Sequence, residues 1–218
     1  MPEDHSDSIW DEYDWERFLQ EQERRTEKYM ELLEKYTDHP QRDEIIAREM
    51  GWTHLIGGES RDWEDEVEAG FEDELSETGS SDMRETPFFF GFEKHPLYRQ
   101  AIGFTAELDE IFAGAGEKVQ EHPATVALHS EATLAAAKLA AALNDDDVDE
   151  LGMSIAYLKR ALRALTVSLG AVAQLMEGSF IAAPCAELLN SRIFSIRDGI
   201  VSAMGEFRAE FRRRYGSQ

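Results

Sequence analysis

Histidine and acidic residues are the first groups in this sequence that could hold a metal ion. A dinuclear site in a helical bundle needs inward glutamates together with Glu-x-x-His on two helices. None of the six histidines follows a glutamate at that spacing, and no His-x-x-x-His pair occurs. A site assembled from distant residues is kept as an alternative, with His129, Glu131, Glu107 and Glu110 as its candidates. Exposed carboxylates and a capping or half-buried histidine explain the same residues, so we predict no metal and no cofactor.

Nucleophilic chemistry has one candidate, Cys185, the only cysteine of the chain. It follows a proline near a predicted helix start, where free N–H groups lower a thiol pKa. No histidine is near it in sequence, and free cysteines are usually buried, so we favour a core role. The chain has no Gly-rich phosphate loop, no Gly-x-Ser-x-Gly and no Cys-x-x-Cys. No catalytic residue is predicted, and a non-enzymatic role is favoured.

Aromatic residues in acidic surroundings are the candidates for protein contact. Trp63 and Phe71 belong to a short amphipathic pattern with apolar residues four apart, on a strongly acidic background. A phenylalanine cluster follows, which either covers one end of the C-terminal helices or forms an exposed adhesive patch. The predicted interaction residues are Trp63, Phe71, Phe88, Phe89, Phe90 and Phe92.

The charge of the chain is concentrated in its N-terminal part. The formal net charge is −23; residues 1–93 hold 29 acidic against 9 basic residues, and residues 94–218 hold 16 against 13. An acidic half repels phosphate backbones and attracts basic proteins. We therefore predict a protein partner, of basic character, and no direct nucleic-acid binding; a homo-oligomer is left open.

Arginines of the C-terminal part offer a second explanation for the acidic half. They either complement helix C-terminal dipoles or receive the acidic half, in the same chain or in a partner. The two roles do not exclude each other. The arginines concerned are Arg160, Arg163, Arg192, Arg197, Arg208, Arg212, Arg213 and Arg214.

The segments that must position these groups are mostly helical by pattern, because their apolar residues recur every three or four positions. The clearest stripe steps by three and four over about 147–177, which is typical of helices that cross at roughly 20°. If Leu162, in its middle, is buried, replacement by alanine costs about 2–5 kcal/mol. The stripe consists of Val148, Leu151, Ile155, Leu158, Leu162, Leu165, Leu169, Val172 and Met176.

Three further stripes, from residue 97, from Pro123 and after Pro184, complete the predicted fold. It is all-α: an antiparallel four-helix bundle with an acidic N-terminal helical extension. The predicted domains are an acidic helical hairpin (1–56), an acidic linker with a short amphipathic helix and a Phe-rich loop (57–93), and the four-helix bundle (94–218).

The remaining expectations concern class and location. No apolar run approaches the roughly 20 residues of a membrane helix, and the acidic N-terminus lacks the pattern of a secretory signal. A cytoplasmic location is expected.

The preferred function is a non-enzymatic interaction or scaffold protein whose acidic, aromatic-rich N-terminal half engages a partner or its own bundle. The alternative is a small-ligand or metal-binding bundle, including an enzyme, with His129, Glu131, Glu107 and Thr105 turned inward.

Overall fold

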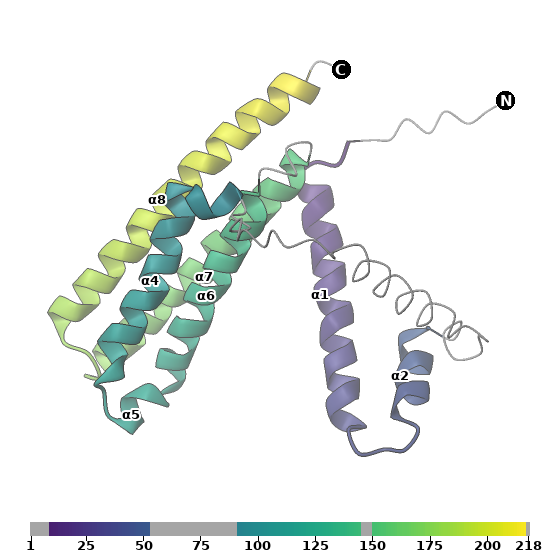
Figure 1. The fold of residues 1–218 in the computed structure, drawn as a ribbon, viewed down its shortest axis with the longest axis horizontal. Coiled ribbons are helices and arrows are strands. Elements are labelled where there is room, and N and C mark those ends of the chain that lie inside the picture. The colour runs from purple at the N-terminus through teal and green to yellow at the C-terminus, as the bar shows by residue number, and fades with distance from the viewer. Residues whose placement is uncertain (1–8, 53–90, 145–149, 217–218) are drawn as a thin grey trace, which may run out of the picture. The chain divides into compact units, whose positions relative to one another are not determined.

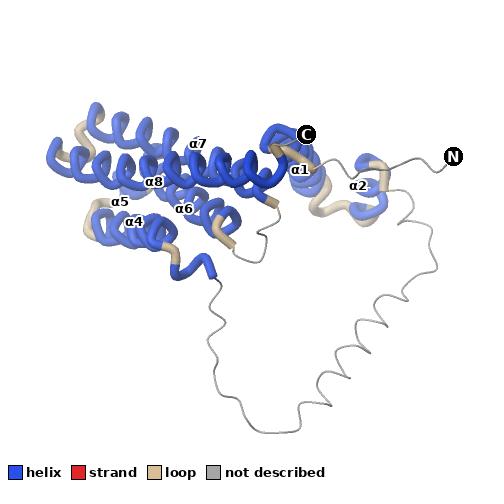
Figure 2. Tube along the Cα trace, turned by 90° about the horizontal axis from the view of Figure 1, so that it is seen from above, coloured by secondary structure: helices blue, strands red, loops and turns tan. Residues whose placement is uncertain are grey.

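A computed structural model describes residues 9–52, 91–144 and 150–216, and every regular element in these ranges is a helix (Figure 1; Figure 2). The prediction of an all-α protein is therefore confirmed. The 3-10 helix η2 covers Gly91–Lys94. The α-helices are α1 (Glu12–Lys35), α2 (Arg42–Met50), α4 (Pro96–Ala113), α5 (Glu117–Gln120), α6 (Pro123–Ala142), α7 (Leu151–Glu177) and α8 (Ala183–Tyr215). No helix of the described ranges has the length and apolar character needed to cross a membrane.

The chain forms two compact units, which we describe separately. The core unit comprises, of the described residues, 9–17, 91–144 and 150–216. The hairpin unit comprises residues 18–52. The core unit thus includes the first turns of α1 together with all the C-terminal helices.

Four long helices, α4, α6, α7 and α8, run alongside one another and share the core (Figure 1; Figure 2). The most extensive contact joins α6 and α7, and α4 packs on both α6 and α8. The stripes predicted for α6 and α8 face this core, because apolar side chains three and four apart share one side of a helix. Their buried members are Leu128, Ala132, Ala135, Leu139 and Ala142 in α6, and Leu189, Ile193, Ile196, Ile200 and Ala203 in α8.

The buried face of α7 differs from the predicted stripe. Leu162 is only half-buried and Met176 is 45% exposed, whereas Ala161, Ser168 and Leu175 are buried. Helix α7 packs against both α6 and α8, so it buries a broader face than a single partner would require. Small side chains on that face let the neighbouring backbones approach, and a 3-4 stripe of large residues does not reveal them.

Two histidines act as caps of the core helices. His95 and His122 stand at the N-caps of α4 and α6, and each is followed by a proline. Their Nδ1 atoms accept hydrogen bonds from the backbone N–H groups of Leu97 and Ala124, both at 3.2 Å. Capping satisfies N–H groups that have no partner within the helix, so these imidazoles have a structural role.

The hairpin unit contains the rest of α1 and the short helix α2. Helix α2 ends at Met50, and the C-cap residue Gly51 has a φ of 77°, which favours glycine. The rings of Tyr29 and Trp52 lie 5.8 Å apart, and the Lys28 ammonium donates to the carbonyl oxygen of Glu49. Helix α1 has no buried residue.

Candidate functional site

The start of α1 is fixed by a reciprocal pair of aspartates. The Asp11 carboxylate accepts hydrogen bonds from the N–H groups of Tyr13 (2.7 Å) and Asp14 (2.9 Å), and the Asp14 carboxylate accepts from the N–H of Asp11 at 3.2 Å. The Asp11 N–H and the Arg17 side chain lower the pKa of Asp14. This arrangement is a capping box with aspartate in both positions, and it sets the direction of the helix.

Glu12 and Glu16, one turn apart, extend from this start to basic residues of α7 and α8. The Arg208 guanidinium donates to Glu12 at 3.0 and 3.1 Å, and the Lys159 ammonium lies 3.3 Å from the same carboxylate. Arg160 donates to Glu16 at 3.2 Å. We call these five residues the N-terminal clamp.

Two members of the clamp are well covered, whereas Arg208 is 40% exposed. The side chains of Glu12 and Arg160 are 12% and 10% exposed. Lys159 also lies over the Tyr13 ring, 4.3 Å from its centroid. Salt screens the Glu16–Arg160 pair less than it screens pairs at the surface.

Backbone contact between the N-terminal segment and α7 accompanies the charge pairs. A Cβ added to Gly152 would lie 2.5 Å from the Trp10 carbonyl oxygen and 3.0 Å from Cδ1 of Trp15. The rings of the two tryptophans meet edge to face at 5.0 Å. Ala156, one turn after Gly152, is fully buried. The first turn of α7 thus needs glycine where the N-terminal segment passes over it.

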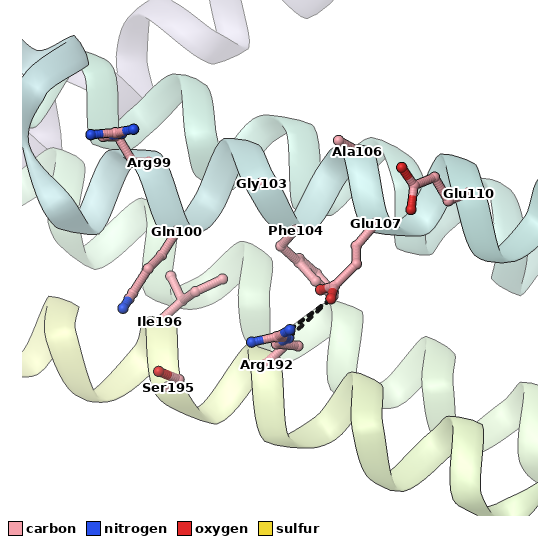
Figure 3. A pocket seen from close by; sticks show the side chains of 10 residues that line it. All are labelled: Arg99, Gln100, Gly103, Phe104, Ala106, Glu107, Glu110, Arg192, Ser195 and Ile196. Carbon is pink, nitrogen blue, oxygen red and sulfur yellow. Dashed lines mark hydrogen bonds and ion pairs between the residues drawn. The ribbon is translucent and has the colours of Figure 1, made fainter.

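The four residues predicted as metal-ligand candidates do not come together at one site. Glu107 accepts from Arg192 of α8 at 2.8 Å, whereas His129 of α6 lies 3.3 Å from Asp109. Figure 3 shows Glu107 directed toward α8 and Glu110 pointing away from it. Glu131 lies half-buried on α6. In the part of the chain that the structure describes, no three His, Cys, Asp or Glu side chains are grouped to hold a metal ion.

A cleft of about 330 Å³ lies between α4 and α8, and the Glu107–Arg192 pair lies within it (Figure 3). Near the start of α4 the two helices approach closely, since a Cβ on Gly199 would meet Leu97 at 2.7 Å. A Cβ on Gly103 would meet no atom within 4 Å, so the helices leave open space there. The ion pair therefore connects α4 and α8 beside an open part of the cleft, and we assign it a structural role.

A second cavity, of about 370 Å³, lies where α4 ends and α6 begins. His129 lines it, and its ring meets that of Phe112 edge to face at 5.5 Å. Of the inward residues in the alternative prediction, His129 lines this cavity and Glu107 the α4–α8 cleft. Thr105 is half-buried, and its hydroxyl donates to the carbonyl oxygen of Ile102 at 2.8 Å.

Only one of the aromatic interaction candidates falls within the described ranges. Phe92 is half-buried against the core, and its ring meets that of Tyr98 edge to face at 4.9 Å. It therefore packs on the helical core. The candidates outside the described residues are Trp63, Phe71, Phe88, Phe89 and Phe90.

Two of the arginines expected to receive acidic residues do so within the core unit, namely Arg160 and Arg208. Arg192 pairs with Glu107 of α4. Arg197 pairs with its neighbour Asp198, and Arg213 and Arg214 pair with Glu210 on α8 itself. Arg163 and Arg212 are exposed. Cys185 is half-buried against the core.

Sequence reasoning did not identify the residues of the N-terminal segment that make these contacts. The Asp11-x-x-Asp14 spacing is a capping-box signal, and it predicts a helix start four residues before Trp15. Glu12 and Glu16 share a helix face by their spacing. No local pattern distinguishes Gly152 or Lys159 as their partners.

Comparison with known proteins gives no relative: no family model, no curated protein and no solved structure matches this chain.

Proposed function

We propose that this chain is a non-enzymatic interaction protein, in which an antiparallel four-helix bundle of α4, α6, α7 and α8 is the scaffold for an acidic N-terminal half. The N-terminal clamp carries this proposal. A carboxylate that is 12% exposed and accepts from one guanidinium while contacting one ammonium is a specific docking contact. It attaches the first turns of α1 to α7 and α8 within the core unit.

The energetics of the clamp support a docking role. Removing a carboxylate from water is unfavourable by several kcal/mol unless it is paired and hydrogen-bonded. Glu12 and Glu16 meet this condition because Lys159, Arg160 and Arg208 contact them. A segment bound in this way is selected by charge, which favours acidic over basic or apolar sequences.

The remaining acidic surface supports a basic partner. Glu27, Glu31 and Glu34 are exposed and lie four and three residues apart on α1, so they share one helix face. Helix α1 has no buried residue, which leaves this face accessible within the hairpin unit. Such a face attracts lysine- and arginine-rich segments at long range, and the attraction weakens as salt is added.

A non-enzymatic role is supported by the state of the charged groups. The carboxylates of the clamp and Glu107 in the α4–α8 cleft are engaged with cations. Catalytic groups need a reacting atom within hydrogen-bond reach and a protonation state suited to the transfer. A structural role in ion pairs accounts for these carboxylates without a catalytic one.

Carbodiimide cross-linking tests the proposal, because it joins carboxylates directly to lysines of a bound protein. The full chain is mixed with cell extract, cross-linked, and digested for mass spectrometry. We expect cross-links from peptides of α1 to lysine-rich segments of a partner. The triple variant E27Q/E31Q/E34Q should lose most of them.

The matched control is E121Q/E177Q/E187Q, which removes three exposed acids from the core unit with the same change in net charge. It should retain the partner and its cross-links. Equal capture by both triple variants would show that the acidic face of α1 does not select the partner, and the proposal would then be wrong.

A further inference from the structure

Helix α6 is the least charged of the four long helices, and its apolar residues are not confined to one side. Only Glu131 and Lys138 of its 20 residues carry a formal charge, in a chain of which 31% of the residues are charged. Its inward side is buried in the core, against α4 and α7. A helix that is apolar all round is normally buried all round, and the outward side of α6 departs from this rule.

The outward side of α6 is open to solvent and has no charged side chain. Val126 and Leu134 are 53% and 42% exposed, so two large apolar residues are accessible there. The residues between and beside them are small or hydroxylated, and all are exposed except the half-buried Ala141. Spacings of three and four residues place them on one side of the helix. This α6 face consists of Val126, Ser130, Thr133, Leu134, Ala137 and Ala141.

An interface between two copies must avoid the acidic surfaces of the chain. The net charge is −23, so two copies repel each other wherever those surfaces meet. The α6 face brings no like charges together. A basic partner gains nothing from a face without carboxylates, whereas a second copy can cover its apolar residues here without electrostatic cost. The charge distribution thus favours a second copy as the occupant of this face.

The order of large and small residues on the α6 face is complementary to itself in the antiparallel direction. A two-fold axis through the middle of the face brings its first residue opposite its last in the second copy. Each large side chain then meets a smaller one, which lets the two helices approach closely. A parallel pair would instead set valine against valine and leucine against leucine. The antiparallel facing pairs are Val126 with Ala141, Ser130 with Ala137, and Leu134 with Thr133.

The charges beside the α6 face are also complementary in this arrangement. Glu131 and Lys138 are seven residues apart, so they lie along one line of the helix. The Lys138 ammonium lies 5.6 Å from the centroid of the Tyr157 ring, which marks this line as the side next to α7. An antiparallel two-fold pair places the α7 sides of both copies on the same edge. Glu131 of each copy therefore comes beside Lys138 of the other.

We infer that the α6 face binds a second copy of this chain through an antiparallel pair of α6 helices, with Glu131 and Lys138 of the two copies paired along one edge. The interface uses neither the clamp nor the acidic face of α1. It therefore goes beyond the proposed function, and either can fail without the other. One helix pair is smaller than a standard interface of about 1,600 Å², so we expect a dissociation constant in the micromolar range.

Sedimentation equilibrium of the full chain measures this association. We expect the mass to rise from that of a monomer toward that of a dimer across the micromolar range. Leu134→Glu places two carboxylates at the centre of the interface and should weaken the dimer at least tenfold. The residue is exposed, so the fold should persist, which far-UV circular dichroism checks. The matched control is Val201→Glu, at a 54% exposed position of α8, and it should dimerise as the wild type does.

Charge exchange identifies the residues that meet at the edge. Glu131→Lys and Lys138→Glu, each alone, bring like charges together across the interface and should weaken the dimer. Mixed in equal amounts, the two variants should associate more tightly than either does with itself. The reason is that the changed residue of one variant faces an opposite charge in the other.

Three results would overturn the inference. The first is a chain that stays monomeric across the whole concentration range. The second is a dimer that Leu134→Glu leaves intact, because another surface would then hold the two copies together. The third is the absence of any gain in association when the two charge variants are mixed, since the antiparallel pairing requires it.

Discussion

The Glu12 carboxylate accepts hydrogen bonds from the Arg208 guanidinium at 3.0 and 3.1 Å, although 196 residues separate the two in the chain. The contact joins the first turn of α1 to the last third of α8 within the core unit. Lys159 of α7 contacts the same carboxylate. One acidic side chain thus connects three helices, and its removal should affect all of them.

We expect Glu12→Gln to lower the free energy of unfolding by about 1–3 kcal/mol, because it leaves two cations without their shared partner. The cost stays moderate because the Arg208 and Lys159 side chains are 40% and 26% exposed and can be hydrated. Urea unfolding followed by tryptophan fluorescence measures it.

A double-mutant cycle measures the interaction energy of Glu12 and Arg208 apart from their contacts with other residues. Arg208→Gln alone and in combination with Glu12→Gln should give a favourable coupling energy of about 1 kcal/mol or more. Glu31→Gln, at an exposed site on α1, should change stability by less than about 0.5 kcal/mol. Additive effects of the two clamp substitutions would show that Glu12 and Arg208 do not interact in solution.

Two glycines of α7 should respond in opposite directions to alanine. Gly152→Ala would place a methyl group 2.5 Å from the Trp10 carbonyl oxygen, so the N-terminal segment must move and stability should fall by about 1–3 kcal/mol. Gly170→Ala meets nothing within 4 Å and should stabilise the helix by about 0.5–1 kcal/mol.

Hydrogen exchange locates the effect of these substitutions. Amides of residues 12–17 should lose protection in Gly152→Ala and keep it in Gly170→Ala, while the centre of α8 stays protected in both. If Gly152→Ala were as stable as the wild type, the close approach of Trp10 to α7 would be refuted.

Replacing leucines of the α7 stripe by alanine should lower the free energy of unfolding by different amounts. Leu165 is 1% exposed, so Leu165→Ala should cost about 2–5 kcal/mol, whereas Leu162 is half-buried and its replacement should cost clearly less. Thermal or urea unfolding of both variants makes the comparison. A larger loss at Leu162 would show that the predicted stripe, and not the broader face, is the true core side of α7.

The contrast between α6 and α7 shows how far periodicity predicts this fold. All five stripe residues predicted for α6 are buried. The α7 stripe is only partly correct, because a helix with two neighbours buries more than one stripe and uses small residues such as Ala161 and Ser168 to do so. Periodicity of large apolar residues does not detect a second face made of small ones.

The candidate site was harder to predict than the fold. The excess of acid in the N-terminal half and the arginines of α7 and α8 suggest attraction, and Arg160 and Arg208 do contact acidic residues. The identity of those acids depends on the tertiary structure, because the partners are 144 and 196 residues apart.

The end of α8 should respond to acid through Glu210. Arg213 and Arg214 hold its carboxylate at 2.5 and 2.6 Å and lower its pKa from the ordinary 4.5 to about 2. A carboxyl with a lowered pKa stabilises the folded state fully above its ordinary value. This contribution is lost as the pH falls from about 4.5 to about 2.

A carboxyl-carbon NMR titration measures the pKa of Glu210 directly. The variant Arg213→Gln/Arg214→Gln should return it toward 4.5, and salt should reduce the shift because the Arg213 side chain is exposed. A midpoint near 4.5 in the wild type would show that these ion pairs do not form at the end of α8.

The separation of Glu12 from Arg208 also has a consequence in time. A ribosome adding about 5–20 residues per second needs roughly 10–40 s to pass from the first to the second. Lys159 is made well before Arg208, so Glu12 meets its two cations in sequence, and the bidentate one comes last. During that interval the Glu12 carboxylate lacks its Arg208 partner. The complete clamp therefore forms only after the last third of α8 has been made.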